Sequence, residues 1–186
     1  MEPTLLKITE QLNNHNITWA VGGSLMLSIR GLETTPNDID LLVTESDAPR
    51  LLQVLETLGE KQQPKSSHPH LFSTYFSQFR INGIGVDVMA DFGVKHEIGM
   101  YISPLHVEIS ERFPCPLSSL EDWYVLYLLM PNRESKALLI EDYFQKHGVL
   151  KPTLLQNALT QPLPPSIVDR IHQVLTHSVT DLNARE

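Results

Sequence analysis

Asp38 and Asp40 are the residues whose type and spacing most directly suggest chemistry. They are separated by Ile39. In a β-strand, residues two apart point to the same face, so both carboxylates would project together while Ile39 packs on the other side. Carboxylate oxygens are the ligands that Mg²⁺ prefers, and water and substrate phosphates usually complete its shell. The pair therefore predicts metal-assisted phosphoryl chemistry, and a solvated strand end is the alternative interpretation.

A Gly22-Gly23-Ser24 triplet precedes the acidic pair. Glycines allow a ligand to approach the backbone closely, and the N–H groups that open a helix attract phosphate. Ser24 is predicted to be the N-cap of this helix and to offer its hydroxyl to a phosphate oxygen. Apolar runs over 19–21 and 41–43 predict two short strands with the helix between them. The triplet alone could be an ordinary turn, but its combination with the acidic pair favours a phosphate site.

Asp87 is the candidate for a third acid, which a centre with two cations about 4 Å apart would need. An Asn82-Gly83 turn predicts a hairpin whose second strand carries Asp87 between two valines. A charge is unusual in such an apolar strand unless its face is a site, and an exposed position on a half-polar strand is the alternative. We expect Asp87 to be a metal ligand or a base. Asp91 is expected to be a loop residue or a helper of the site.

The Gly-Gly-Ser turn, the Asp38-Ile39-Asp40 segment and Asp87 between valines together resemble the signature of the polymerase-beta-like nucleotidyltransferase superfamily. The resemblance covers about the first 110 residues. It is nearest to the small bacterial minimal nucleotidyltransferases, which include lincosamide and aminoglycoside nucleotidyltransferases and antitoxin-type proteins. It implies a Mg-dependent enzyme that moves a nucleoside monophosphate from an NTP, such as ATP, to a hydroxyl acceptor and releases pyrophosphate. Two Mg²⁺ ions would be its cofactors.

The resemblance also implies roles for individual residues. The catalytic residues would also be the metal ligands: Asp38, Asp40 and Asp87. The nucleotide-binding residues would lie in the turn and at the start of a later helix: Gly22, Gly23, Ser24, Arg133 and Lys136. Asp87 could instead activate the acceptor hydroxyl. Without the resemblance, Arg133 and Lys136 would be interpreted as a solvated helix start.

The sequence departs from the family pattern just ahead of the acidic pair. Many small-molecule nucleotidyltransferases have Arg-x-Thr there, whereas this chain has Thr34-Thr35-Pro36-Asn37. A cation near the triphosphate is therefore missing at this place, and Arg30 and Arg80 are the candidates to replace it. The departure leaves an alternative function open, that of a catalytically idle nucleotide-binding or antitoxin-like partner protein.

Composition and charge fit a compact cytoplasmic enzyme. The 186 residues are 41% hydrophobic, and the formal net charge of −8 argues against binding of long nucleic acid, which usually needs a basic face. Cys115 is the single cysteine, so an intrachain disulfide is impossible. No apolar run is long enough for a signal or membrane segment, so no membrane partner is expected. The expected partners are an NTP and an unidentified hydroxyl acceptor, while the oligomeric state stays open.

The elements that must position these residues follow from periodicity and from glycine and proline punctuation. The resemblance implies an α/β (α+β) fold with a mixed nucleotidyltransferase-type sheet flanked by helices, and the later helical period predicts a helical C-terminal portion. The predicted domains are a nucleotidyltransferase core over 1–112 and a helical portion over 113–186 that packs on it. Helices are predicted over 5–14, 48–58, 120–130, 135–147, 153–159 and 166–177. Further strands are predicted over 17–21, 71–79, 96–102 and 106–109, and a polar loop over 60–69.

Overall fold

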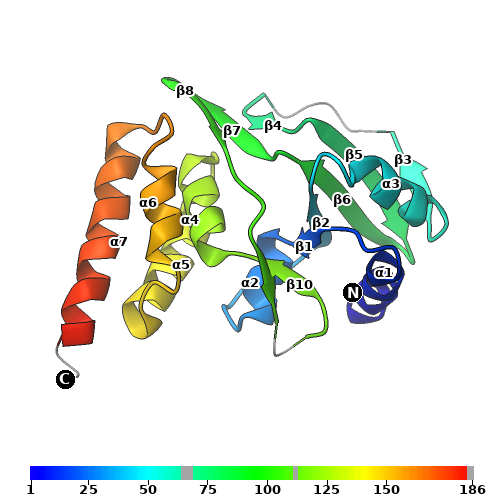
Figure 1. Ribbon diagram of the computed structural model, residues 1–186, viewed down its shortest axis with the longest axis horizontal. Coiled ribbons are helices and arrows are strands. Elements are labelled where there is room, and N and C mark those ends of the chain that lie inside the picture. Colours follow the sequence, from blue (N-terminus) through cyan, green and yellow to red (C-terminus); the bar gives the residue numbers. More distant parts are fainter. Residues whose placement is uncertain (64–68, 111–112, 184–186) are drawn as a thin grey trace. The chain divides into compact units, whose positions relative to one another are not determined.

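The computed structural model describes residues 1–63, 69–110 and 113–183 (Figure 1). The helices are α1 (Glu2–Asn14), α2 (Gly23–Ile29), α3 (Ala48–Glu56), α4 (Leu120–Leu129), α5 (Glu134–His147), α6 (Pro152–Ala158) and α7 (Pro165–Asn183). The strands are β1 (Trp19–Val21), β2 (Asp38–Val43), β3 (Glu60–Gln62), β4 (Leu71–Phe72), β5 (Tyr75–Ile81), β6 (Ile84–Ala90), β7 (Gly93–His96), β8 (Gly99–Ile102), β9 (Val107–Ile109) and β10 (Pro116–Ser118). The expected mixed α/β fold is confirmed. Over the described ranges, no helix combines the length and apolar character needed to cross a membrane.

Contacts divide the chain into two compact units. Unit 1 comprises Met1–Phe92 and Pro104–Ser119, and unit 2 comprises Gly93–Ser103 and Leu120–Glu186. The division into domains at 112 and 113 stays a prediction. Each unit is described by itself below.

A seven-stranded sheet forms the centre of unit 1, with the strand order β3-β5-β6-β2-β1-β10-β9 (Figure 1). Strand β2 is parallel to β6 and antiparallel to β1, while β5 is antiparallel to both β6 and β3. On the other side of β1, β10 pairs in parallel and is followed by the antiparallel edge strand β9. Strands β2 and β6 are therefore paired on both sides, which fixes the backbone that carries the acids.

One face of this sheet is apolar and buried. It carries Ile39 and Leu41 of β2 and Val86 and Val88 of β6, all with 0% exposure. Helix α3 packs against β5, β6 and α1, and the apolar stripes of α1 and α3 are buried. Burial of each such side chain stabilises the fold by about 1.5–3 kcal/mol. This packing holds the alternate residues of β2 and β6 on the opposite face.

The Asn82-Gly83 turn forms as predicted. Both residues have positive φ, 50° and 78°, which is the combination that a type I′ hairpin turn requires. The turn joins β5 to β6 with Ile81 opposite Ile84. It therefore determines which residue of β5 lies opposite Asp87.

Unit 2 consists of the β7–β8 hairpin and helices α4 to α7. The Gln161 side chain ties the hairpin to the helices, because it accepts from the backbone N–H of Ile102 (3.0 Å) and donates to the carbonyl of the same residue (2.9 Å). Among the helices, Tyr124 donates to Glu141 (2.5 Å), which also pairs with Arg170 (2.8 Å). Burial, followed by the Glu141 carboxylate, raises the pKa of Tyr124.

Some local predictions were wrong. The predicted loop over 60–69 begins with strand β3, and its residues 64–68 lie outside the described part of the chain. The predicted strand over 96–102 is a hairpin of β7 and β8, and the one over 71–79 is divided into β4 and β5. Strand β10 was not predicted, because it forms through pairing with β1 and β9 and has no periodicity of its own.

Candidate functional site

Asp38, Asp40 and Asp87 lie on one face of the central strands. In the parallel β2–β6 pair, Asp40 is opposite Asp87 and Asp38 is opposite Gly85. Residues in register across a ladder point to the same side, and neighbouring strands are about 4.8 Å apart. The three carboxylates are therefore on the face opposite to the buried Ile39. Each of the three residues is partly exposed.

The Gly22-Gly23-Ser24 turn lies directly against this acidic face. The backbone N–H of Gly22 donates to the carbonyl of Asp40 (2.9 Å). Gly23 has a φ of +61°, and a Cβ built on it would lie 1.8 Å from Asp40 Oδ2. The backbone of the turn thus contacts the Asp40 carboxylate at a distance that only glycine permits.

The prediction that Ser24 is an N-cap was wrong. The N-cap of α2 is Gly22, no side chain caps this helix, and Ser24 is the second helical residue. Its carbonyl accepts a hydrogen bond from Thr34 Oγ1 (2.8 Å). Helix α2 begins two residues earlier than an N-cap at Ser24 would require, and its first residue, Gly23, has a left-handed φ of +61°. The phosphate-binding role of Ser24 stays a prediction.

Gln78 is a polar residue of this face that the sequence interpretation missed. It lies on β5 opposite Asp87, and its Nε2 donates to Asp87 Oδ1 (3.0 Å). The signal was present in the sequence, because counting backward from the Asn82-Gly83 turn in an antiparallel hairpin pairs Gln78 with Asp87.

Asp91 lies beyond the end of β6, which finishes at Ala90. It has a φ of +47°, and its Oδ2 accepts a hydrogen bond from Thr74 Oγ1 (3.0 Å). Its carboxylate therefore binds Thr74 at the end of the strand. The alternation that places Asp87 on the face of the other acids does not extend to Asp91.

The two arginines considered as replacement cations have other partners. Arg30 ends α2, where it forms an ion pair with Glu108 of β9 (2.5 Å) and donates to the carbonyl of Ser118 of β10 (2.9 Å). Arg80 donates to the Gly83 carbonyl at the hairpin turn (3.0 Å) and is exposed. Arg30 thus joins a helix to the edge of the sheet.

Arg133 and Lys136 belong to unit 2. Arg133 is the N-cap residue of α5, and its carbonyl accepts from the backbone N–H of Lys136 (2.9 Å). The Lys136 ammonium lies 5.3 Å from the centroid of the Tyr127 ring, a cation–π distance. Their contact with nucleotide phosphates stays a prediction.

The donor chemistry of the acidic face suits Mg²⁺, since all three side chains offer carboxylate oxygens on one side of two adjacent strands. The side chains as they stand do not converge. Within the described residues, no group of three or more histidine, cysteine, aspartate or glutamate side chains is arranged to hold a metal ion. Asp40 is turned toward Gly23, and Asp87 is bonded to Gln78. Metal binding at this face would therefore require the Asp40 carboxylate to turn away from Gly23.

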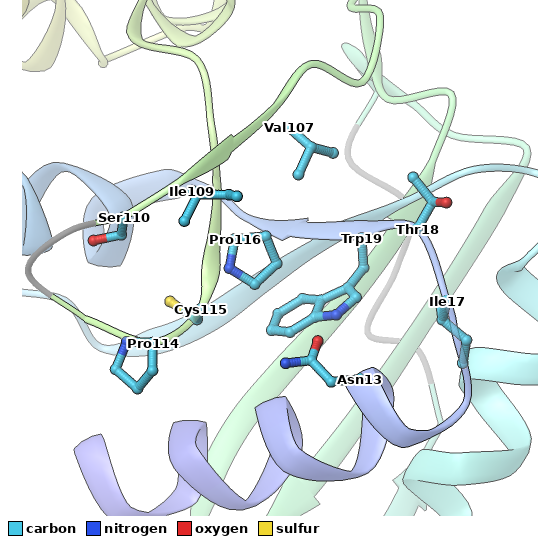
Figure 2. A pocket seen from close by; sticks show the side chains of 10 residues that line it. All are labelled: Asn13, Ile17, Thr18, Trp19, Val107, Ile109, Ser110, Pro114, Cys115 and Pro116. Atoms are coloured by element: carbon cyan, nitrogen blue, oxygen red, sulfur yellow. The ribbon is translucent and has the colours of Figure 1, made fainter.

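A cavity of about 440 Å³ lies at the other end of the sheet, where β1 meets β10 and β9 (Figure 2). Its lining includes Asn13, Trp19, Val107, Cys115 and Pro116 and none of the predicted site residues. Cys115 is buried there, which raises the pKa of its thiol to about 12 and leaves it protonated and unreactive at neutral pH. The cavity is thus separate from the acidic face.

Solved structures show the same fold. TM1012 of Thermotoga maritima, which was assigned as a nucleotidyltransferase, superposes with a TM-score of 0.59 and 26% identity over 78% of this chain and 92% of its own. The antibiotic-resistance factor ANT(2″)-Ia superposes with a TM-score of 0.54 and 16% identity, over 80% of this chain and 89% of its own. The lincosamide antibiotic adenylyltransferase LnuA superposes with a TM-score of 0.51 and 14% identity, over 76% of this chain and 96% of its own. The last two likenesses concern the fold alone.

The family assignment comes from the first part of the chain. No curated protein sequence matches at a significant level. A family model for aminoglycoside-2″-adenylyltransferase matches residues 4–111, a range that contains the turn and all three acids. The resemblance to the polymerase-beta-like nucleotidyltransferase superfamily is confirmed. Because the match spans more than half of its residues, this chain belongs to the aminoglycoside-2″-adenylyltransferase family.

Proposed function

We propose that this protein transfers a nucleoside monophosphate from an NTP to a hydroxyl group of a small acceptor, with two Mg²⁺ ions. The observation that carries the proposal is the register of β2 and β6, which puts Asp87 beside Asp40 and on the same face as Asp38. Family membership supports nucleotidyl transfer as the general reaction.

In the proposed reaction, the acceptor oxygen bonds to the α-phosphorus while the bond from this phosphorus to the β-bridging oxygen breaks, and pyrophosphate leaves. Asp38 and Asp40 would hold the cations, and Asp87 would complete their ligands or take the hydroxyl proton. Bound Mg²⁺ would neutralise charge on the phosphates and lower the pKa of the acceptor hydroxyl. Positioning of the reactants is then the main task of the protein.

The nucleotide would be held by the Gly22-Gly23-Ser24 turn and by two basic side chains. The proposed contacts to the triphosphate are Gly22, Gly23, Ser24, Arg133 and Lys136. Support for the turn comes from its contact with the acidic face, where the backbone of Gly23 meets the carboxylate of Asp40. Support for Arg133 and Lys136 comes from their positive charge and from their place at the start of α5.

The acceptor is proposed to be a small molecule. A structure of ANT(2″)-Ia contains adenylyl-2″-tobramycin, and one of LnuA contains lincomycin. Hydroxyl-bearing antibiotics are therefore the first acceptors to test, with a tRNA end and a protein hydroxyl as the other classes. Labelled NTPs offered with each class would identify the product.

Isosteric variants of the acids test the enzyme. Asp38→Asn, Asp40→Asn and Asp87→Asn should each lower Mg²⁺-dependent pyrophosphate release by at least about a hundredfold while the circular dichroism spectrum is unchanged. Asp91→Asn is the matched control, because it makes the same substitution beyond the end of β6. Full turnover by a folded Asp38 or Asp40 variant would refute the assignment.

A catalytically idle nucleotide-binding or antitoxin-like protein is the second candidate. The observation that favours it is the absence of arginine over residues 34–37, together with the engagement of Arg30 by Glu108. Calorimetric titration with ATP, GTP, CTP and UTP, with and without Mg²⁺, separates the two functions. Metal-dependent binding followed by pyrophosphate release indicates the enzyme. Binding without release indicates an idle nucleotide-binding protein, and no binding at all indicates an antitoxin-like partner protein.

A further inference from the structure

Gln78 is the polar side chain that contacts Asp87 from the neighbouring strand. The two residues are directly opposite each other in the antiparallel β5–β6 ladder, and Nε2 of Gln78 lies 3.0 Å from Asp87 Oδ1. Both are partly exposed. An ionised carboxylate can only accept hydrogen bonds, so the amide nitrogen is the atom that faces it.

The backbone at Gln78 is fixed on both sides. Strand β5 pairs with β6 on one side and with β3 on the other, where Gln62 lies opposite Gln78. The amide therefore projects from an anchored strand, and the hydrogen bond restricts the orientation of the Asp87 carboxylate. Hydrogen bonds to a charged group are also stronger than those between neutral groups.

We infer that Gln78 is a positioning residue for the reaction, which sets the orientation of Asp87 and thereby its use as a ligand or base. This inference rests on the proposed function. Gln78→Asn shortens the side chain by one methylene, so that its amide would not reach Asp87 from the same backbone, whereas Gln78→Met keeps the length and removes the donor. Loss of the donor leaves Asp87 in place and removes the hydrogen bond from Gln78 that orients its carboxylate.

The test compares Gln78→Met with Gln62→Met, the same change at the residue in register with Gln78 on β3. Gln62 is also partly exposed, and its Nε2 donates to the carbonyl of Glu60 (3.1 Å). Gln78→Met should lower kcat about tenfold or more, as loss of a residue that orients a ligand typically does. It should leave the KM for the NTP within about twofold. Gln62→Met should change neither. Equal effects of the two variants, or a change in KM alone, would refute a positioning role.

A second readout does not depend on turnover. Binding of Mn²⁺ to the protein, followed by electron paramagnetic resonance, is measured for wild type, Gln78→Met, Asp87→Asn and the double variant. If Gln78 acts through Asp87, its substitution weakens binding in the wild type and has no further effect beside Asp87→Asn. Additive losses would overturn the inference, as would unchanged binding in Gln78→Met.

The outcomes also separate this inference from the function on which it rests. If the Asp87→Asn protein binds Mn²⁺ and turns over the NTP at the wild-type level, the proposed site is refuted. If Asp87→Asn is impaired and Gln78→Met is not, only the positioning role fails. Should Gln78→Met not fold, Gln78→Asn keeps a polar amide at the position and is expected to show the same loss of kcat, because its shorter side chain does not reach Asp87.

Discussion

The carboxylate of Asp40 occupies the space that a side chain at position 23 would need. A Cβ on Gly23 would lie 1.8 Å from Asp40 Oδ2 and 2.9 Å from its Cγ. The backbone N–H of the preceding Gly22 donates to the carbonyl of the same aspartate. Two motifs that are separated in the sequence by helix α2 therefore contact each other directly, and the position of the Asp40 carboxylate requires glycine at position 23.

This contact predicts the effect of Gly23→Ala. The new methyl group must displace the Asp40 carboxylate, and the residue must also keep a φ of +61°. We expect a loss of more than about 2 kcal/mol in the free energy of unfolding, and loss of NTP turnover in the protein that remains folded. Urea unfolding and pyrophosphate release measure the two effects.

Gly83→Ala is the control for that variant. Gly83 has a similar φ of +78°, but a Cβ there has no neighbour within 4 Å among the described residues. It should cost only about 1–2 kcal/mol, the penalty of the left-handed conformation, and retain turnover. If both variants lose the same stability and the same activity, the contact with Asp40 has no importance of its own.

Local patterns predicted much of the site from the sequence. Alternation put Asp38 and Asp40 on one face, and the Asn82-Gly83 turn predicted the hairpin that carries Asp87. The register of β2 with β6, which aligns Asp40 with Asp87, could not be derived, because it joins strands distant along the chain. The expectation that Asp87 joins Asp38 and Asp40 in one site therefore depended on the family resemblance and not on local sequence patterns.

Other features depended on tertiary contacts. Arg30 was a candidate phosphate ligand in the sequence, and only the position of Glu108 beside it shows another role. Strand β10 was missed for a similar reason, since its three residues acquire strand structure by pairing with β1 and β9. Short elements with distant partners leave little periodic signal in the sequence.

Asp47 gives a pH-dependent prediction. Its Oδ2 accepts from the backbone N–H of Thr18 (2.8 Å), and Oδ1 pairs with Arg50 (2.6 Å). The Thr18 hydrogen bond, followed by the weaker contribution of Arg50, lowers the pKa of Asp47 against the opposing effect of burial. A carboxyl whose pKa is lower in the folded state stabilises the fold above its unfolded pKa, and this contribution is lost as pH falls through the folded pKa.

Asp47→Asn should therefore reduce the free energy of unfolding at pH 7 by about 1 kcal/mol. The difference from wild type should persist down to about pH 4, the ordinary aspartate pKa, and shrink below it. Urea unfolding at a series of pH values measures it. Asp142→Asn on the exposed face of α5 serves as the control for a change of charge alone. A difference that grows toward low pH would contradict the assignment.

The ion pair between Arg30 and Glu108 allows a test of whether Arg30 stabilises the fold or binds the nucleotide. Their side chains are only 13% and 15% exposed, so removal of the arginine leaves a largely buried carboxylate without its ion pair. Arg30→Met should lower the free energy of unfolding by roughly 3 kcal/mol, and the double variant with Glu108→Gln should recover part of it. Arg80→Met, at an exposed position, should cost no more than about 0.5 kcal/mol. If Arg30 is structural, NTP affinity of the folded Arg30→Met protein stays at the wild-type value; a large fall in affinity with unchanged stability would instead identify Arg30 as the missing triphosphate cation.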